Sequence, residues 1–190
     1  MHSMLSTIRG AIDLDASKIN EQQSLTSKEK KTLQNHWPMM MECNPELFKK
    51  AWIRSAQRST SIKKAFGMEE NEDPEKNEQF MKLPLTIENF FKELIIDCEC
   101  DERKIRPKCE QLGARHIDFS GRGFHSNFWD IFLVCMMEVI GECSMKCSEN
   151  QKRVCVLAWN RLLNAVVKDM RAGYDNRRRS IGHRKSKQDE

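Results

Sequence analysis

The sequence predicts an all-α protein with six to eight helices around a single core. Apolar residues recur at spacings of three and four along several segments of the 190-residue chain, and no stretch alternates apolar and polar residues for long. Only one Tyr and eight Gly are present, which also favours helices over sheet. A chain of this length forms one domain with some tail. We expect an N-terminal extension at residues 1–25, one domain at 26–174 and a basic, disordered tail at 175–190, with both extensions flexible.

The first predicted helix begins at Thr26, which stands at capping-box spacing from Glu29. It runs through Trp37, where the following Pro38 disfavours helical geometry and predicts a bend or a stop. A second helix follows Asn44–Pro45, a capping residue and a proline suited to the first helical position. One face of this second helix is made of Leu47, Phe48, Ala51, Trp52 and Ser55.

The middle of the chain alternates connectors with apolar segments. Residues 67–77 are acidic and form a connector. The next segment has its apolar residues at helical spacing: Phe80, Leu83, Ile87, Phe90, Phe91, Leu94 and Ile95. Because Pro84 removes a helical hydrogen bond, the helix must begin close to it or kink. Residues 97–106 are a charged link, and residues 107–117 form a short segment that carries His116.

Two further helices complete the predicted fold. A Gly-rich turn at 120–123 precedes residues 128–140, which are apolar on nearly every side, as in a buried helix. The last helix spans about 150–172, and Gly173 closes it as a C-cap. Its apolar stripe consists of Cys155, Trp159, Leu162, Val166 and Met170.

Composition and charge exclude several classes of protein. No apolar run approaches the roughly 20 residues that cross a bilayer, and the N-terminus lacks the apolar stretch of a secretory signal, so we expect a cytoplasmic protein without a transmembrane segment.

The net charge of +4 belongs to the residues from Arg171 onward. A basic tail without interleaved aromatic residues is a poor nucleic-acid-binding domain. The eight cysteines are expected to be reduced, and their spacing lacks the paired sets of a zinc site. Within the tail, residues 177–180 (RRRS) resemble a substrate of basophilic kinases, the alternative being a solvated basic tail.

A set of motifs stands in order along the chain: Trp37, Phe66, Leu112-Gly113-Ala114-Arg115-His116, the Gly-rich turn, Ala158-Trp159 and Met170-Arg171-Ala172-Gly173-Tyr174. This arrangement resembles the globins, most closely the neuroglobin-like and nematode-type intracellular branch, over residues 26–174. The motifs at 112–116 and 158–174 are specific, and the middle of the span is looser. The resemblance implies a globin fold that binds haem b (iron protoporphyrin IX).

The resemblance makes His116 the proximal ligand of the haem iron. Ferrous haem iron takes a neutral imidazole nitrogen, and one axial bond from the protein leaves the opposite face open to a gas. Ligand histidines usually donate their other N–H to a carbonyl, which fixes the ring. The same resemblance implies that Phe66 stacks against the porphyrin, that Phe119 and Phe128 line the proximal side, and that Trp52 points into the distal side.

The distal side departs from the usual globin pattern. Aligning Phe80 with the aromatic residue that starts the distal helix places Leu83 where most globins carry His or Gln. A shift of one residue gives Lys82 or Pro84 instead, and Ile87 is the usual apolar residue over the iron. Because Leu83 cannot donate a hydrogen bond to bound oxygen, we predict fast oxygen dissociation or easy autoxidation, and good tolerance of carbon monoxide.

Two side chains could modify this prediction. The indole N–H of Trp52 is a donor and would partly restore oxygen binding. Lys82 as a sixth ligand to the iron is the other possibility, although a lysine here is more simply a solvated charge.

The function implied by the resemblance is reversible binding of oxygen or another diatomic gas, for transport, storage or sensing, without enzymatic activity. One alternative is a redox globin that passes electrons with a reductase as partner, reduces nitrite or consumes nitric oxide. A second is a globin-shaped interaction module without haem, against which His116 and Phe66 argue. The sequence gives no indication of the oligomeric state.

Overall fold

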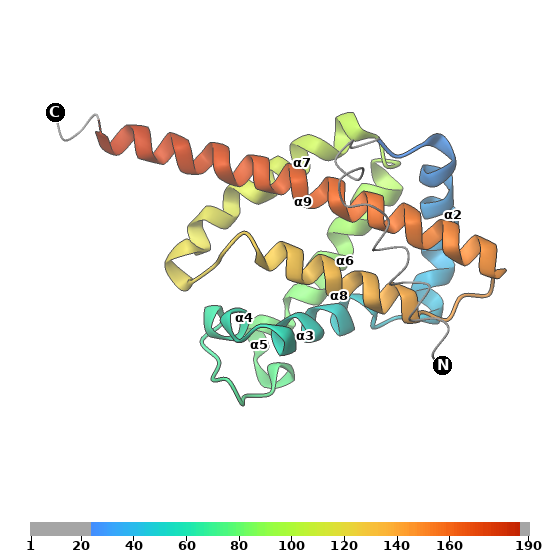
Figure 1. Cartoon of the computed structure of the whole chain (residues 1–190), viewed down its shortest axis with the longest axis horizontal. Coiled ribbons are helices and arrows are strands. Elements are labelled where there is room, and N and C mark those ends of the chain that lie inside the picture. The colour runs from blue at the N-terminus through green and yellow to red at the C-terminus, as the bar shows by residue number, and fades with distance from the viewer. Residues whose placement is uncertain (1–23, 187–190) are drawn as a thin grey trace, which may run out of the picture.

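Helices make up every regular element in residues 24–186, the part of the chain that the computed structural model describes (Figure 1). The α-helices are α2 (Ser27–Cys43), α3 (Leu47–Arg58), α4 (Thr60–Ala65), α5 (Glu78–Met81), α6 (Leu83–Lys92), α7 (Glu102–Arg115), α8 (Phe128–Glu142) and α9 (Glu149–Ser186). Two 3-10 segments, η1 (Pro74–Lys76) and η3 (His116–Arg122), and a π-helical turn, η2 (Glu93–Asp97), link them. The all-α prediction is confirmed. Most of the predicted N-terminal extension lies outside the described residues.

Helix α2 begins as its sequence predicts and ends later. The Thr26 side chain accepts a hydrogen bond from the Glu29 N–H at 3.3 Å, and the Glu29 carboxylate accepts one from the Thr26 N–H at 2.9 Å. The helix then continues through Pro38 to Cys43, so of the predicted bend or stop, the stop is wrong. Met40, two residues beyond the proline, is fully buried. Burial of this apolar turn offsets the one backbone hydrogen bond that a proline removes.

The prolines and cap residues at the other helix starts act as local signals. Pro84 lies in the first turn of α6, where its missing N–H costs nothing, so the helix begins beside it as expected. Helix α7 begins earlier than predicted, because the Asp101 side chain caps it by accepting from the Arg103 N–H at 3.0 Å. The charged link predicted at 97–106 is therefore half helical.

Gly173 does not end the last helix. Helix α9 runs on to Ser186, so residues 175–186 are helical where the sequence predicted a disordered tail. A Cβ atom on Gly173 would lie 1.9 Å from the Glu110 carbonyl oxygen, and one on Gly113 would lie 1.8 Å from the Met170 carbonyl oxygen. The two glycines therefore mark the point where α7 and α9 cross with their backbones in contact.

The buried apolar side chains form two clusters. The larger one lies among α2, α3, α6, η2, α7, α8 and α9, and includes Trp37, Phe48, Phe91 and Trp159. The smaller one has five buried members, Ala56, Ile62, Met68, Phe80 and Phe128. Trp52 and Phe66 pack against the smaller cluster, and Phe124 packs against both. The aromatic residues that the sequence assigns to the pocket thus gather mainly around the smaller cluster.

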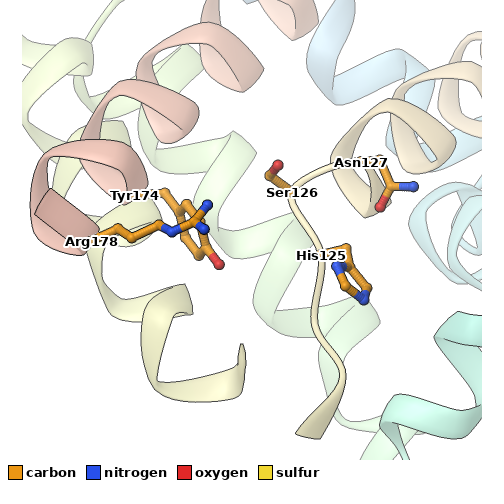
Figure 2. Close-up of a pocket in the computed structure, with 5 residues that line it drawn as sticks. All are labelled: His125, Ser126, Asn127, Tyr174 and Arg178. Atoms are coloured by element: carbon orange, nitrogen blue, oxygen red, sulfur yellow. The ribbon is translucent and has the colours of Figure 1, made fainter. Parts of the chain in front are cut away.

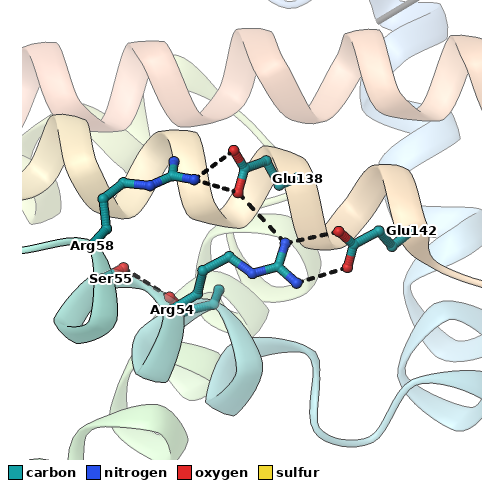
Figure 3. A network of polar contacts seen from close by, with 6 residues as sticks. Arg54, Ser55, Arg58, Glu138 and Glu142 are labelled. Atoms are coloured by element: carbon teal, nitrogen blue, oxygen red, sulfur yellow. Dashed lines mark hydrogen bonds and ion pairs between the residues drawn. The ribbon is translucent and has the colours of Figure 1, made fainter. Parts of the chain in front are cut away.

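An ion-pair ladder joins α3 to α8 on the surface (Figure 3). Arg54 donates two hydrogen bonds to the Glu142 carboxylate, both at 2.9 Å. Arg58 binds Glu138 at 2.9 Å, and the Arg54 guanidinium reaches the same carboxylate at 3.5 Å. Arg54 is thus bidentate on Glu142, Arg58 uses one nitrogen for both oxygens of Glu138, and the Glu138 carboxylate is shared by the two arginines.

Six of the eight cysteines are buried, and all eight are free thiols. Burial raises the pKa of Cys100, Cys109 and Cys155 to about 12. Since the thiolate is the reactive form, these interior thiols are chemically inert at neutral pH.

Within residues 24–186, no helix is both long enough and apolar enough to span a membrane.

Candidate functional site

His116 stands at the junction of α7 and η3, where one ring nitrogen is tied to the backbone. Its Nδ1 lies 2.8 Å from the Leu112 carbonyl oxygen, one turn earlier in α7. A carbonyl can only accept, so Nδ1 carries the proton and the lone pair is on Nε2. Among the described residues no hydrogen bond uses Nε2. The histidine therefore presents a free imidazole lone pair in a fixed orientation.

Aromatic rings surround the His116 imidazole on the proximal side. The ring centroids lie 5.7 Å away for Phe119, 5.0 Å for Phe124 and 5.3 Å for Trp129. Burial among these rings lowers the pKa of His116 below its usual value of 6.5. The imidazole is therefore neutral at pH 7, which is the form that binds a metal ion.

The helix that carries His116 is positioned by the crossing of α7 and α9. Gly113 lies three residues before His116 and touches the backbone of Met170. Tyr174 follows Gly173 at the same crossing, and its ring lies 5.9 Å from both Phe124 and Trp129. His116, the aromatic rings around it and the glycine contact thus form one continuous unit.

The predicted pocket residues on α3 and α4 form a second aromatic group. Trp52 on α3 stacks on Phe80 with a centroid distance of 4.8 Å, and Phe66, just after α4, meets Phe80 edge-on at 5.2 Å. The Trp52 indole N–H donates to the Phe80 carbonyl oxygen at 3.0 Å. From the sequence this N–H is a candidate donor of a hydrogen bond to bound oxygen, but in the structure it donates to the Phe80 carbonyl oxygen.

The predicted distal residues lie at the start of α6. Lys82 precedes the helix and is exposed, while Leu83 and Ile87 are half-buried. Ile87 packs against the larger cluster. None of these three side chains shares a described hydrogen bond or ion pair with His116 or Trp52.

Two predicted proximal residues fall in different places. Phe119 contacts His116, although it is 43% exposed. Phe128 is buried in the smaller cluster and lies one ring further out, 5.5 Å from Phe124. The sequence analysis did not single out Phe124 or Trp129, which make the closest ring contacts with His116. Phe124 directly follows the Gly-rich turn, and Trp129 lies at the start of the predicted apolar helix at 128–140; these positions were the available signals.

The chemistry of these donors fits a haem. One neutral imidazole with a fixed Nδ1–H and an unused Nε2 is what an axial position of haem iron takes. The neighbouring aromatic rings offer an apolar lining for a porphyrin. His116 would hold the iron and Phe119 would lie beside it, whereas the described ring contacts of Phe66 are with Trp52 and Phe80.

Comparison with known proteins bears on the whole arrangement. The Globin family model matches residues 49–170, from α3 into α9. The chain is also 32% identical over 72 residues to the globin-related protein glb-13 of Caenorhabditis elegans, a match that covers 38% of this chain and 24% of that protein. The chain thus spans about a quarter of the length of the curated relative it matches.

Proposed function

This chain belongs to the globin family, and from that premise we propose that it binds haem b through His116 and reversibly binds oxygen or another diatomic gas on the opposite face. Haem, when bound, supplies an iron centre with one open axial position. Transport, storage and sensing are all uses of that chemistry, and a cytoplasmic setting is part of the proposal.

The observation that carries this proposal is the state of His116. The Leu112 carbonyl holds the proton on Nδ1, and burial keeps the ring neutral, so Nε2 is ready to bind without prior deprotonation. Three rings flank the imidazole, with centroids 5.0–5.7 Å from its own. A fully exposed histidine would not have a lowered pKa.

The distal side favours a second candidate function. Leu83 and Ile87 offer no donor, and the Trp52 N–H already has the Phe80 carbonyl as its partner. Without a donor the pocket gives oxygen little stabilisation and releases it or oxidises readily. A redox globin that works with a reductase, reduces nitrite or consumes nitric oxide would have this property. Exposed Lys82 remains the less favoured sixth ligand.

The first experiment is the absorption spectrum of the full chain expressed with a haem supply. We expect an intense Soret band in the wild type and its loss in His116→Ala. His36→Ala is a matched control, because His36 makes the same kind of contact, from Nδ1 to the Thr32 carbonyl at 2.8 Å, but lies on α2. A Soret band that survives in His116→Ala, or is absent from the wild type, would contradict the proposal, and the latter result would leave an interaction module.

The reduced form separates gas binding from electron transfer. A single broad visible band after reduction with dithionite indicates a five-coordinate iron that is open to a gas. Sharp, split bands indicate an internal sixth ligand and favour electron transfer. Rapid turnover with a cellular reductase would also favour the redox function, whereas a stable oxygen complex would count against it.

A further inference from the structure

A small polar cleft lies between α9 and the segment that leads into α8, on the outer side of the aromatic wall. It has a volume of about 240 Å³ and is lined by His125, Ser126, Asn127, Tyr174 and Arg178. Figure 2 shows Tyr174 and Arg178 projecting from α9 toward the segment that carries the other three residues. Nothing in the proposed haem chemistry uses this cleft.

The Tyr174 hydroxyl is the feature that needs an explanation. The residue is 8% exposed, so more than nine-tenths of it is buried. Every fully buried side-chain nitrogen or oxygen in the described residues has a hydrogen-bond partner. The Tyr174 hydroxyl has no such partner among those residues, so it must open onto the cleft that it lines. A buried tyrosine normally finds a partner for its hydroxyl, which indicates that a ligand or solvent supplies one here.

The charge around the cleft is positive. No carboxylate lines it, and Arg178 makes no ion pair within residues 24–186. The nearby Asp130 is already neutralised by Arg171 at 2.7 Å, and Arg171 also reaches the Ser126 carbonyl at 3.4 Å. Asn127 is the N-cap of α8, and its side-chain oxygen accepts no capping hydrogen bond. The Arg178 guanidinium and the hydroxyls of Tyr174 and Ser126 therefore border one space.

We propose that this cleft binds a small oxyanion of the phosphate class, either inorganic phosphate or a small phosphomonoester. The volume of about 240 Å³ is below the roughly 300 Å³ at which pockets begin to enclose drug-sized molecules, so the cleft suits a small anion. Arginine and hydroxyl donors are the groups that proteins use for phosphate oxygens. A lipid headgroup would add a membrane surface that nothing in the cleft requires, so the proposal commits to a free anion.

An anion in this cleft would be coupled to His116 through two rings. Tyr174 lies 5.9 Å from Phe124 and from Trp129, and these rings lie 5.0 Å and 5.3 Å from the His116 imidazole. Gly173, next to Tyr174, touches the backbone of α7. Ordering Tyr174 would therefore reach the proximal ligand both through ring contacts and through the helix crossing. This coupling, unlike the binding itself, rests on the proposed haem function.

The binding test is calorimetric titration of inorganic phosphate into the full chain at fixed ionic strength, with glycerol 3-phosphate and chloride as comparison ligands. Arg178→Gln should weaken phosphate binding about tenfold or more, as expected for a charge-assisted hydrogen bond, and Tyr174→Phe by roughly two- to tenfold. Arg177→Gln is the matched control, since Arg177 is an exposed neighbour on α9 outside the cleft. Absence of phosphate binding, or equal weakening by all three variants, would overturn the site. Tighter binding of glycerol 3-phosphate than of inorganic phosphate would identify the phosphomonoester as the ligand.

The coupling has its own readout in the haem-loaded protein. Phosphate should change the gas affinity of the wild type, and this change should be smaller in Tyr174→Phe. Because the calorimetric arm needs no haem, a failure of the haem proposal and a failure of the anion site give different results. Phosphate binding with an unchanged gas affinity would overturn the coupling.

Discussion

The two predicted sides of the haem site differ in how their residues are held. On the α7–α9 side three kinds of contact position His116, whereas on the α6 side no described hydrogen bond or ion pair positions the side chains of Leu83 and Ile87. His116 has a carbonyl partner for Nδ1, aromatic rings at 5.0–5.7 Å and a backbone-to-backbone helix crossing one turn away. Leu83 and Ile87 are half-buried and contribute only bulk.

The difference teaches which properties each side can set. Under the proposed function, the α7–α9 side would determine whether haem is held and at what orientation, and it should tolerate little change because its key contact involves main-chain atoms. The α6 side would determine how long a gas remains, and its side chains should be exchangeable without moving a helix. Changes on the two sides should therefore have different readouts and different sizes.

The largest effect is expected from adding a side chain at the glycine contact between α7 and α9. Gly113→Ala places a Cβ atom at 1.8 Å from the Met170 carbonyl oxygen, so the two helices must separate. We expect a loss of about 3 kcal/mol in the free energy of unfolding, at the upper end of overpacking costs, together with weaker haem retention. Urea denaturation and the rate of haem loss measure the two consequences.

Gly121→Ala is the control for this experiment, since a Cβ atom there meets nothing within 4 Å. Alanine gains about 1 kcal/mol over glycine in a helix interior, so a net loss in Gly113→Ala isolates the clash. Equal stability of the two variants would show that the helices do not touch as described.

An intermediate effect is expected from placing a hydrogen-bond donor on the α6 side. Leu83→His should slow oxygen release about tenfold, the change that one hydrogen bond of roughly 1.4 kcal/mol produces. Stopped-flow displacement of oxygen by carbon monoxide measures the rate. Ile87→His, one turn further along α6, is the comparison. If Ile87→His slows release and Leu83→His does not, the distal position is one turn later than the sequence alignment places it.

The smallest effect is expected at Trp52. Trp52→Phe keeps a ring against Phe80 but leaves its carbonyl without the indole donor, so the free energy of unfolding should fall by about 1 kcal/mol. Oxygen release should stay unchanged, because the N–H faces the backbone. Faster oxygen release in this variant would mean that the indole does serve the gas, as the sequence analysis allowed.

Much of the fold could be predicted because its signals are local. The Thr26–Glu29 capping box and Pro84 act within one helical turn, and the structure confirms both. The stop predicted at Pro38 is wrong because burial of Met40, a tertiary effect, outweighs the local cost. Local sequence identified these two helix starts, and it cannot weigh a helix-breaking residue against burial in the core.

The candidate site shows the same division. His116 could be singled out from its motif, and its carbonyl partner lies one turn away. Gly173 was misread because a glycine at a helix end and one at a close helix crossing look alike in sequence, and Glu110, the group that requires it, is 63 residues earlier. The contacts of Phe124 and Trp129 with His116 likewise depend on how α8 and α9 pack, which no short motif records.

The buried cysteines give this protein a reporter of its own integrity. Cys43 and Cys147 are half-buried, while the other six thiols are enclosed. While the chain stays folded, an alkylating reagent meets few accessible sulfur atoms. Once it opens, the remaining thiols become modified together. Mass spectrometry counts the labels on each molecule. The fraction of molecules that carry labels on the buried cysteines is therefore the fraction that has opened during storage or heating, and its measurement needs no added dye or engineered probe.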